Sequence, residues 1–295
     1  MLRRLIRWAV FLALVGAAVF WWVTRPVTTD PALVAAMTGD PVAGEKIFYA
    51  GGCASCHAVP GSEDKLVLAG GMSFDSPFGV FYAPNISPDP THGIGGWSAL
   101  DLVNAMHNGV SPEGQHYFPA FPYTSYIKAE ISDIVSLHSY LVTLPASDVP
   151  NKPHDVGFPF NIRRTLGGWK FLFLKDGWNV TASLTPEEER GRYLAEALGH
   201  CGECHTPRNP IGGLTLSKWL GGAPNPSGKG NIPNITPGAL SWSEADIAEY
   251  LNSGFTPEFD SAGGHMVEVI ANTSKLPQSD RDAIAAYLKK VSAVN

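Results

Sequence analysis

Two copies of the pattern C-x-x-C-H constrain this chain more than any other feature of its sequence. The residues are Cys53, Cys56 and His57 in the first copy, and Cys201, Cys204 and His205 in the second. Together they use all four cysteines, so no thiol is left for a disulfide or a thiolate axial ligand. The pattern is the attachment signature of a c-type haem, in which both thiols add to the porphyrin vinyl groups and the histidine becomes the proximal iron ligand.

Zinc binding and redox-disulfide chemistry are the competing uses of a C-x-x-C pair. A structural zinc site needs further Cys or His at ligand spacing, and the chain has no third C-x-x-C. Both pairs are followed by His within similar flanks, which favours haem attachment over these alternatives and over a chance match. The sequence therefore predicts two covalently bound haem c groups.

Three short segments occur in both halves of the chain, in the same order and at similar spacing. They are residues 84–88 and 233–237, 97–101 and 242–246, and 109–113 and 254–258. The first pair reads Pro-Asn-Ile-Ser-Pro and Pro-Asn-Ile-Thr-Pro. One haem-binding unit therefore occurs twice, and we expect its repeated asparagines, Asn85 and Asn234, to fix loop backbone.

Helix start signals mark both units. Asp40, Ser98 and Thr185 each stand as an N-cap ahead of an expected helix, and residues 132–144 are apolar at helical spacing. A long loop rich in Gly, Pro and Asn follows the first motif. Three helices separated by loops are typical of a class I cytochrome c. We predict a mainly α fold of two tandem class I cytochrome c domains with an N-terminal transmembrane helix.

The expected boundaries follow from these patterns. Residues 1–26 form a transmembrane anchor, 27–39 a tether, 40–148 the first cytochrome c domain, 149–184 a connector and 185–295 the second cytochrome c domain. The connector is too apolar for a free linker, because it carries two aromatic clusters. We expect it to pack across both domains.

The N-terminus contains an uncharged run from Trp8 to Val23 behind three arginines. Counted from Leu5, the apolar stretch has about 19 residues and spans roughly 28 Å as a helix, near the apolar thickness of a bilayer. A cleavable signal peptide is the alternative. The paired Trp21 and Trp22, and the lack of a clear A-x-A site, favour a retained single-pass anchor. Its arginines predict an inner-membrane protein with the haem domains in the periplasm.

The composition excludes one class of partner. The net charge is −6 and only 16% of the residues are charged. Nucleic-acid binding needs basic patches, so we expect no nucleic-acid partner.

The sixth iron ligand of the second haem is expected at Met266. Class I haems commonly take a methionine sulfur or a second histidine opposite the proximal histidine. Met266 is the only methionine after His205 and lies ahead of the last expected helix. His265, beside it, is the weaker candidate.

The first unit departs from this pattern. Counting twelve residues from Gly254 reaches Met266, whereas counting twelve from Gly109 reaches Phe121, which cannot bind iron. Met72 or His116 is the expected sixth ligand, and a five-coordinate, open iron is the alternative. Two further candidates, Met106 and His107, lie in an expected helix and are better explained by packing or exposure.

Residues 190–194 and 200–209, with the loop 77–90 and the segment 117–125, resemble the cytochrome c subunits of bacterial membrane-bound dehydrogenases that oxidise alcohols, gluconate and aldehydes. The resemblance covers about residues 40–292. Many members carry three haems, whereas this chain has two motifs. The resemblance implies electron transfer from a periplasmic dehydrogenase partner to a quinone or a terminal oxidase.

The residues support electron transfer independently, since the chain has two haem motifs, an apolar N-terminal segment and no candidate catalytic dyad. We therefore expect a non-catalytic electron carrier. The alternative is a dihaem enzyme, peroxidase-like or thiosulfate-oxidising, that uses an open first haem. A haem-based gas sensor is a weaker alternative.

Overall fold

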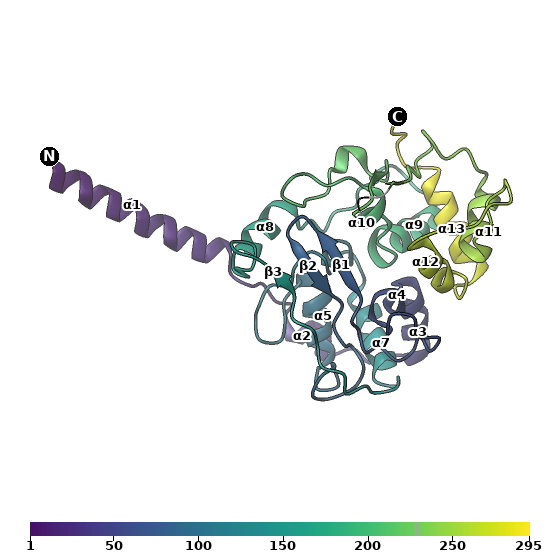
Figure 1. The fold of residues 1–295 in the computed structure, drawn as a ribbon, viewed down its shortest axis with the longest axis horizontal. Helices are drawn as coiled ribbons and strands as arrows, with labels where there is room; N and C mark the ends of the chain where they lie inside the picture. The colour runs from purple at the N-terminus through teal and green to yellow at the C-terminus, as the bar shows by residue number, and fades with distance from the viewer. Residues whose placement is uncertain (227, 229) are drawn as a thin grey trace.

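The computed structural model describes residues 1–226, 228 and 230–295. The chain is mostly helical, as predicted, and its N-terminal helix stands apart from a compact body (Figure 1). This helix, α1, spans Leu2–Val23 and buries none of its residues. Among the described residues it is the one helix long and apolar enough to cross a membrane. A short helix, α2 (Pro31–Ala35), follows, with Asp30 as its N-cap.

The first helical unit runs from α3 to α7. Its helices are α3 (Pro41–Ala50), α4 (Cys53–His57), α5 (Ala99–Asn108), α6 (Tyr123–Tyr126) and α7 (Ile131–Leu141). The expected caps are confirmed: the Asp40 carboxylate accepts from the Val42 amide, and Ser98 forms a capping box with Asp101. Helix α3 packs along α7, and α5 crosses the same helix.

The second helical unit, α9 to α13, repeats this order. Its elements are α9 (Pro186–Arg192), the π-helix η1 (Tyr193–Leu198), α10 (Cys201–His205), the 3-10 turn η2 (Leu216–Lys218), β4 (Ala223–Pro224), β5 (Asn231–Ile232), α11 (Glu244–Ser253), α12 (Met266–Thr273) and α13 (Gln278–Leu288). Thr185 caps α9, as expected, through a capping box with Glu188. Helices α9 and α13 pack together as α3 and α7 do.

A three-stranded antiparallel sheet is the feature that sequence patterns missed. Strands β1 (Ser73–Ser76) and β2 (Gly79–Tyr82) form a hairpin within the expected loop, and β3 (Asp155–Val156) pairs with β2 from the connector. The strands are too short to show an alternating pattern. The connector also forms α8 (Thr165–Phe173). Trp169 donates to the Ile211 carbonyl at 2.8 Å, which confirms that the connector packs on both units.

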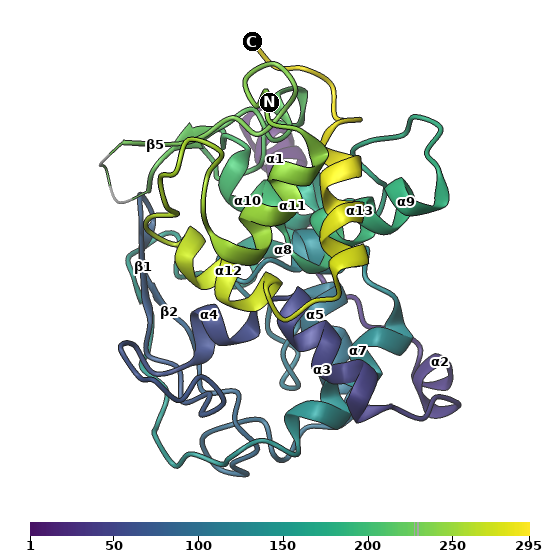
Figure 2. The same cartoon turned by 90° about the vertical axis from the view of Figure 1, so that its right-hand side faces the viewer.

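The two units form one body rather than two separate domains on a string. Helix α12 of the second unit packs on α3 and α4 of the first (Figure 2). The π-helix η1 packs on α3 and α6. One hydrophobic cluster contains buried side chains of both units, including Phe48, Leu194 and Leu198, each fully buried or nearly so. Cys53 and Cys201, the first residues of the two motifs, pack against this shared core.

Glycines allow the closest helix crossings. A Cβ at Gly44 would overlap the Ser136 carbonyl where α3 meets α7, and one at Gly191 would overlap the Ala283 carbonyl where α9 meets α13. Equivalent glycines thus permit the same close approach in both units.

Gly44→Ala is expected to lower the free energy of unfolding by about 1–3 kcal/mol, because the added methyl group must push α3 away from α7. Chemical denaturation of the haem-loaded protein, followed by circular dichroism, measures this change. Gly157→Ala is the matched control, since nothing lies within 4 Å of a Cβ there. An equal loss in both variants would contradict the steric explanation.

Candidate haem sites

Each C-x-x-C-H motif forms a single helical turn. The residue before each motif, Gly52 (φ 58°) or His200 (φ 41°), adopts a left-handed conformation that turns the chain sharply into the first cysteine. Cysteines three positions apart on a helix share one face. All four thiols are free in the structure, so each motif presents two thiols side by side.

The histidine of each motif is held by a carbonyl from its own unit. His57 Nδ1 lies 2.8 Å from the Pro84 carbonyl, and His205 Nδ1 lies 2.8 Å from the Pro233 carbonyl. Because a carbonyl only accepts, Nδ1 carries the proton and the lone pair is on Nε2. An oriented imidazole of this kind is the usual proximal ligand of a metal.

The repeated Pro-Asn-Ile segments explain why these carbonyls are in place. Asn85 Nδ2 donates to the carbonyls of Ser147 and Val149 at 2.8 and 2.9 Å. Asn234 Nδ2 likewise donates to the Val294 carbonyl at 2.7 Å. Each asparagine therefore ties the proline loop to the chain that follows the last helix of its unit, which confirms its expected role in fixing loop backbone.

The thiols differ from those of redox-active C-x-x-C pairs. Burial raises the pKa of Cys53 and of Cys201 to about 12 and that of Cys56 to about 11. Redox-active motifs depress the pKa of a thiol to produce a reactive thiolate. The environment of these cysteines therefore gives no support to disulfide-exchange chemistry.

The donor set fits a haem. Within the described residues, no group of three or more Cys, His, Asp or Glu side chains lies together as a metal site. A haem supplies four nitrogen ligands of its own, so one oriented histidine and two neighbouring thiols per motif are sufficient. Residues 53, 56 and 57 would hold one haem, and residues 201, 204 and 205 the other.

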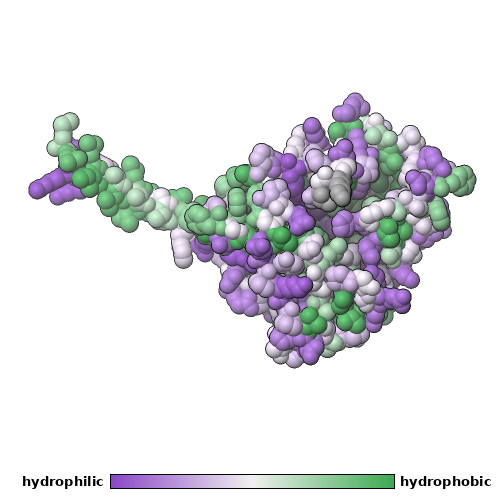
Figure 3. Space-filling view, in the orientation of Figure 1, coloured by the Kyte–Doolittle hydropathy of each residue, from purple (hydrophilic) through white to green (hydrophobic). Residues whose placement is uncertain are grey.

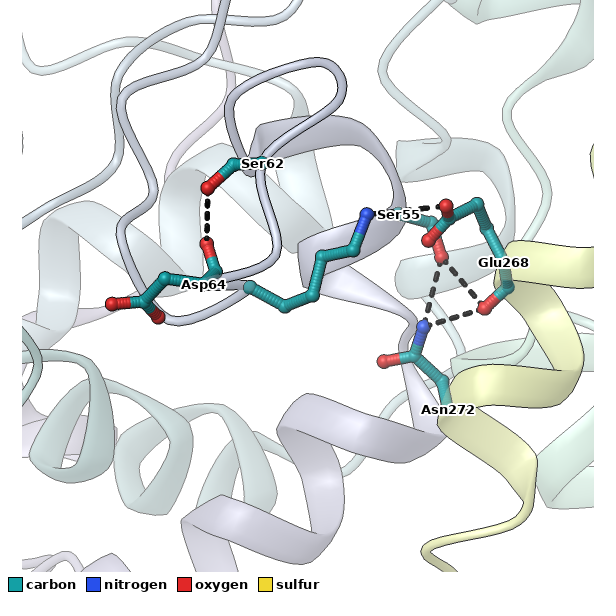
Figure 4. Close-up of polar contacts among 6 residues, drawn as sticks. Ser55, Ser62, Asp64, Glu268 and Asn272 are labelled. Carbon is teal, nitrogen blue, oxygen red and sulfur yellow. Dashed lines mark hydrogen bonds and ion pairs between the residues drawn. The ribbon is translucent and has the colours of Figure 1, made fainter.

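The motif of the first unit is hydrogen-bonded to the second unit. Ser55, the residue before Cys56, accepts from Asn272 Nδ2 at 2.9 Å and donates to the Glu268 carbonyl at 3.3 Å (Figure 4). Both partners lie on α12. The Glu268 carboxylate also pairs with Lys65 at 3.2 Å.

The motif of the second unit makes the converse contact. Glu203, at the same place in its motif as Ser55, accepts from Thr124 Oγ1 at 2.5 Å and from Ser125 Oγ at 3.3 Å. Both partners lie on α6 of the first unit. Arg208 pairs with the same carboxylate and, together with the Thr124 hydrogen bond, holds its pKa below the usual value despite burial. Each motif thus binds the short helix of the other unit.

Met266 is the first residue of that short helix in the second unit and is half-buried, whereas His265 is exposed. Paired β-bridges, Val110 with His116 and Phe255 with Ser261, mark the same turn in both units. Phe121 therefore precedes α6 at the place where Met266 begins α12, in agreement with the sequence count.

The structure places His116 away from the motifs. It is buried beneath the end of α1, where Nε2 lies 2.9 Å from the Thr24 carbonyl and Nδ1 lies 3.0 Å from Lys170 Nζ. The ring thus donates from Nε2 and accepts at Nδ1, so neither nitrogen keeps a lone pair for iron. This geometry does not favour His116 as a ligand.

The other candidates for the sixth ligand of the first haem are Met72, Met106 and His107. The Met72 carbonyl accepts from the Ala83 amide at 2.8 Å. Ala83 precedes Pro84, whose carbonyl orients His57, so the backbone of Met72 lies near the loop that holds this histidine. Met106 is 5% exposed within the hydrophobic core, and His107 Nε2 donates to the Ala129 carbonyl at 2.6 Å.

Sequence comparison identifies the family, although no protein-family model matches the chain. A dihaem c-type cytochrome of Cereibacter sphaeroides is 57% identical over 295 residues, which cover 99% of this chain and all of the relative. The chain belongs to the dihaem c-type cytochromes. Its family name implies two haem groups of the c type, in agreement with the two motifs.

This dihaem cytochrome is also similar to subunits of dehydrogenase complexes. The fructose dehydrogenase cytochrome subunit of Gluconobacter japonicus is 36% identical over 277 residues, and the gluconate 2-dehydrogenase cytochrome c subunit of Pantoea cypripedii is 34% identical over 269 residues. The matches cover 91% and 85% of this chain but only 56% and 59% of those relatives. The resemblance to dehydrogenase cytochrome subunits is thus confirmed.

Ser55→Ala is expected to destabilise the contact between the two units by about 1 kcal/mol, because Asn272 loses a partner in a partly buried hydrogen bond. Denaturant unfolding of the haem-loaded protein measures the effect. Ser62→Ala makes the same chemical change within a bond that Ser62 forms to the nearby Asp64 carbonyl (Figure 4). The idea fails if Ser55→Ala is no less stable than this control.

Proposed function

We propose that this dihaem cytochrome is a membrane-anchored electron carrier that takes electrons from a periplasmic dehydrogenase partner and passes them to a quinone or a terminal oxidase. The observation that carries the proposal is the reciprocal contact between the two units, in which Ser55 of α4 binds α12 and Glu203 of α10 binds α6. The similarity to cytochrome subunits of dehydrogenases supports the choice of partner. The proposal includes two tandem class I cytochrome c domains with the boundaries given above.

The chain's residues have separate roles in this function. The haems would be attached by Cys53 and Cys56 in the first unit and by Cys201 and Cys204 in the second, and His57 and His205 would bind iron. The bound haem supplies a reversible one-electron couple. Burial, and after it the nearby Cys204 thiol, raises the pKa of Cys56, so the two motifs that would hold the haems lie close together across the unit boundary. This proximity supports electron transfer between them.

The join between α1 and the body supports a retained anchor over a cleaved signal peptide. Thr24, just after α1, is 1% exposed. Its hydroxyl accepts from Arg164 Nε at 2.8 Å, and Arg164 Nη2 donates to the Trp21 carbonyl at 2.6 Å. Gly167 packs so closely on Thr24 that a Cβ would overlap its backbone. A leader removed after export would have no need of such contacts.

Met266→Leu is expected to lower the reduction potential of the second haem, because a thioether ligand stabilises ferrous iron. Potentiometric titration followed by visible absorption measures both potentials in the purified protein. Met37→Leu, at a methionine that is 38% exposed, is the matched control. An unchanged second potential would exclude Met266 as the ligand.

His116→Gln is expected to leave the first haem unchanged, because glutamine can still donate to Thr24 and accept from Lys170, and because His116 is not a ligand. Electron paramagnetic resonance of the oxidised, detergent-solubilised protein is the measurement. Altered low-spin g-values in the variant would restore His116 as the ligand.

The same spectrum of the unaltered protein tests the function itself. Two low-spin ferric signals support a pure electron carrier. A substantial high-spin signal would show an open first haem, consistent with Phe121 in the place of Met266, and would favour the peroxidase-like or thiosulfate-oxidising enzyme.

A further inference from the structure

An exposed apolar surface lies on the connector beside the end of α1. We term this surface the connector face; it consists of Phe158, Phe160, Ile162, Phe171 and Leu172. Their exposed fractions run from 42% for Ile162 to 82% for Phe158. Figure 3 shows the apolar surface of α1 continuing onto the body at this junction. Large apolar side chains gathered in one exposed segment mark a contact surface rather than a water-facing one.

Three arginines stand at the same junction. Arg25 lies over the Trp22 ring at 3.7 Å from its centroid, Arg164 over the Trp21 ring at 4.1 Å, and Arg163 over the Phe118 ring at 4.0 Å. In the part of the chain that the structure describes, none of them has a carboxylate within 4 Å. The net charge of the whole chain is −6, so these three arginines form a local excess of positive charge.

Two of these arginines line a cavity that opens at the junction. The cavity has a volume of about 170 Å³, and its other walls are Pro26, Gln115 and His116. A guanidinium has five N–H donors. Hydrogen bonds among the described residues use one donor of Arg163 and two of Arg164. Both guanidinium groups that line the cavity thus keep spare donors, and guanidinium groups bind phosphate well.

The length of α1 sets the depth of this site. A 22-residue helix is about 33 Å long, and the apolar core of a bilayer is about 30 Å thick. The last turn of α1 therefore reaches the headgroup boundary. Arg164 is bonded to the Trp21 carbonyl in that turn, so the cavity lies at the same level. Helix α8 lies next to the end of α1 (Figure 1).

We propose that the connector face is a second membrane contact, inserted among the headgroups of the bilayer that α1 spans, with the Arg163 and Arg164 cavity binding the phosphate of an anionic phospholipid. The inference rests on the proposed retention of α1. Aromatic and aliphatic side chains are stable at the boundary of the acyl chains, and arginines are stable among phosphates. Continuity with α1 favours lipid over a protein partner as the occupant.

Single added cysteines test the contact in the full-length, haem-loaded protein. The native thiols are consumed by haem attachment in the proposed function, so an added cysteine is the only one to react with a charged maleimide. Phe171→Cys reports the connector face, and Ala17→Cys reports α1. Phe259→Cys is the matched control, because Phe259 is 95% exposed on the second unit. Each rate is divided by the rate measured after unfolding.

In nanodiscs that contain phosphatidylglycerol, Cys at 171 is expected to react about tenfold more slowly than Cys at 259, because bilayer burial removes it from water. Adding Arg163→Gln, or using phosphatidylcholine alone, is expected to reduce this protection. Equal rates at 171 and 259, with position 17 protected, would overturn the inference and leave the anchor intact. Rapid reaction of the cysteine at position 17 would overturn both the connector-face contact and the proposed anchor. If the cysteine at position 171 is protected equally with Arg163→Gln and in phosphatidylcholine alone, the proposed phosphate site is wrong.

Discussion

The hydrogen bond from each motif histidine to a proline carbonyl is the interaction on which the rest of this structure depends. It fixes the orientation of each imidazole and leaves Nε2 as the nitrogen that could bind iron. This orientation is kept only if the proline loop is rigid. The asparagine that follows each proline supplies that rigidity by binding chain beyond the last helix of its unit. The loop that orients each proposed iron ligand is thus held by contacts about 60 residues away along the chain.

The exchange of contacts between the units makes the two sites parts of one structure. Ser55 holds α12, which begins with Met266, and Glu203 holds α6, which follows Phe121. Each motif is therefore in direct contact with the segment of the other unit where a sixth ligand is expected. The two sites are similar in fold but differ at this segment, where the second unit has Met266 and the first has Phe121.

The sequence predicted what local chemistry determines. The motifs, the caps at Asp40, Ser98 and Thr185, and the difference between Phe121 and Met266 each follow from residues close together in the chain. The hairpin at Ser73–Tyr82 was missed, because four-residue strands show no clear alternation. The contacts of Ser55 and Glu203 with the other unit, and the partners of the His116 ring, were also missed, since they lie 54 to 217 residues away and no local pattern encodes such pairs.

If α1 is the proposed membrane anchor, the contacts of Arg164 and Gly167 with Thr24 hold the body rigidly against its end. A flexible linker would let the haem-binding units rotate freely and vary their distance from the bilayer. A body held rigidly against α1 would instead diffuse in the plane of the membrane together with the helix, in one fixed orientation. Its collisions with other membrane-bound redox proteins then occur at a set height and orientation, which raises the effective concentration of the productive pair.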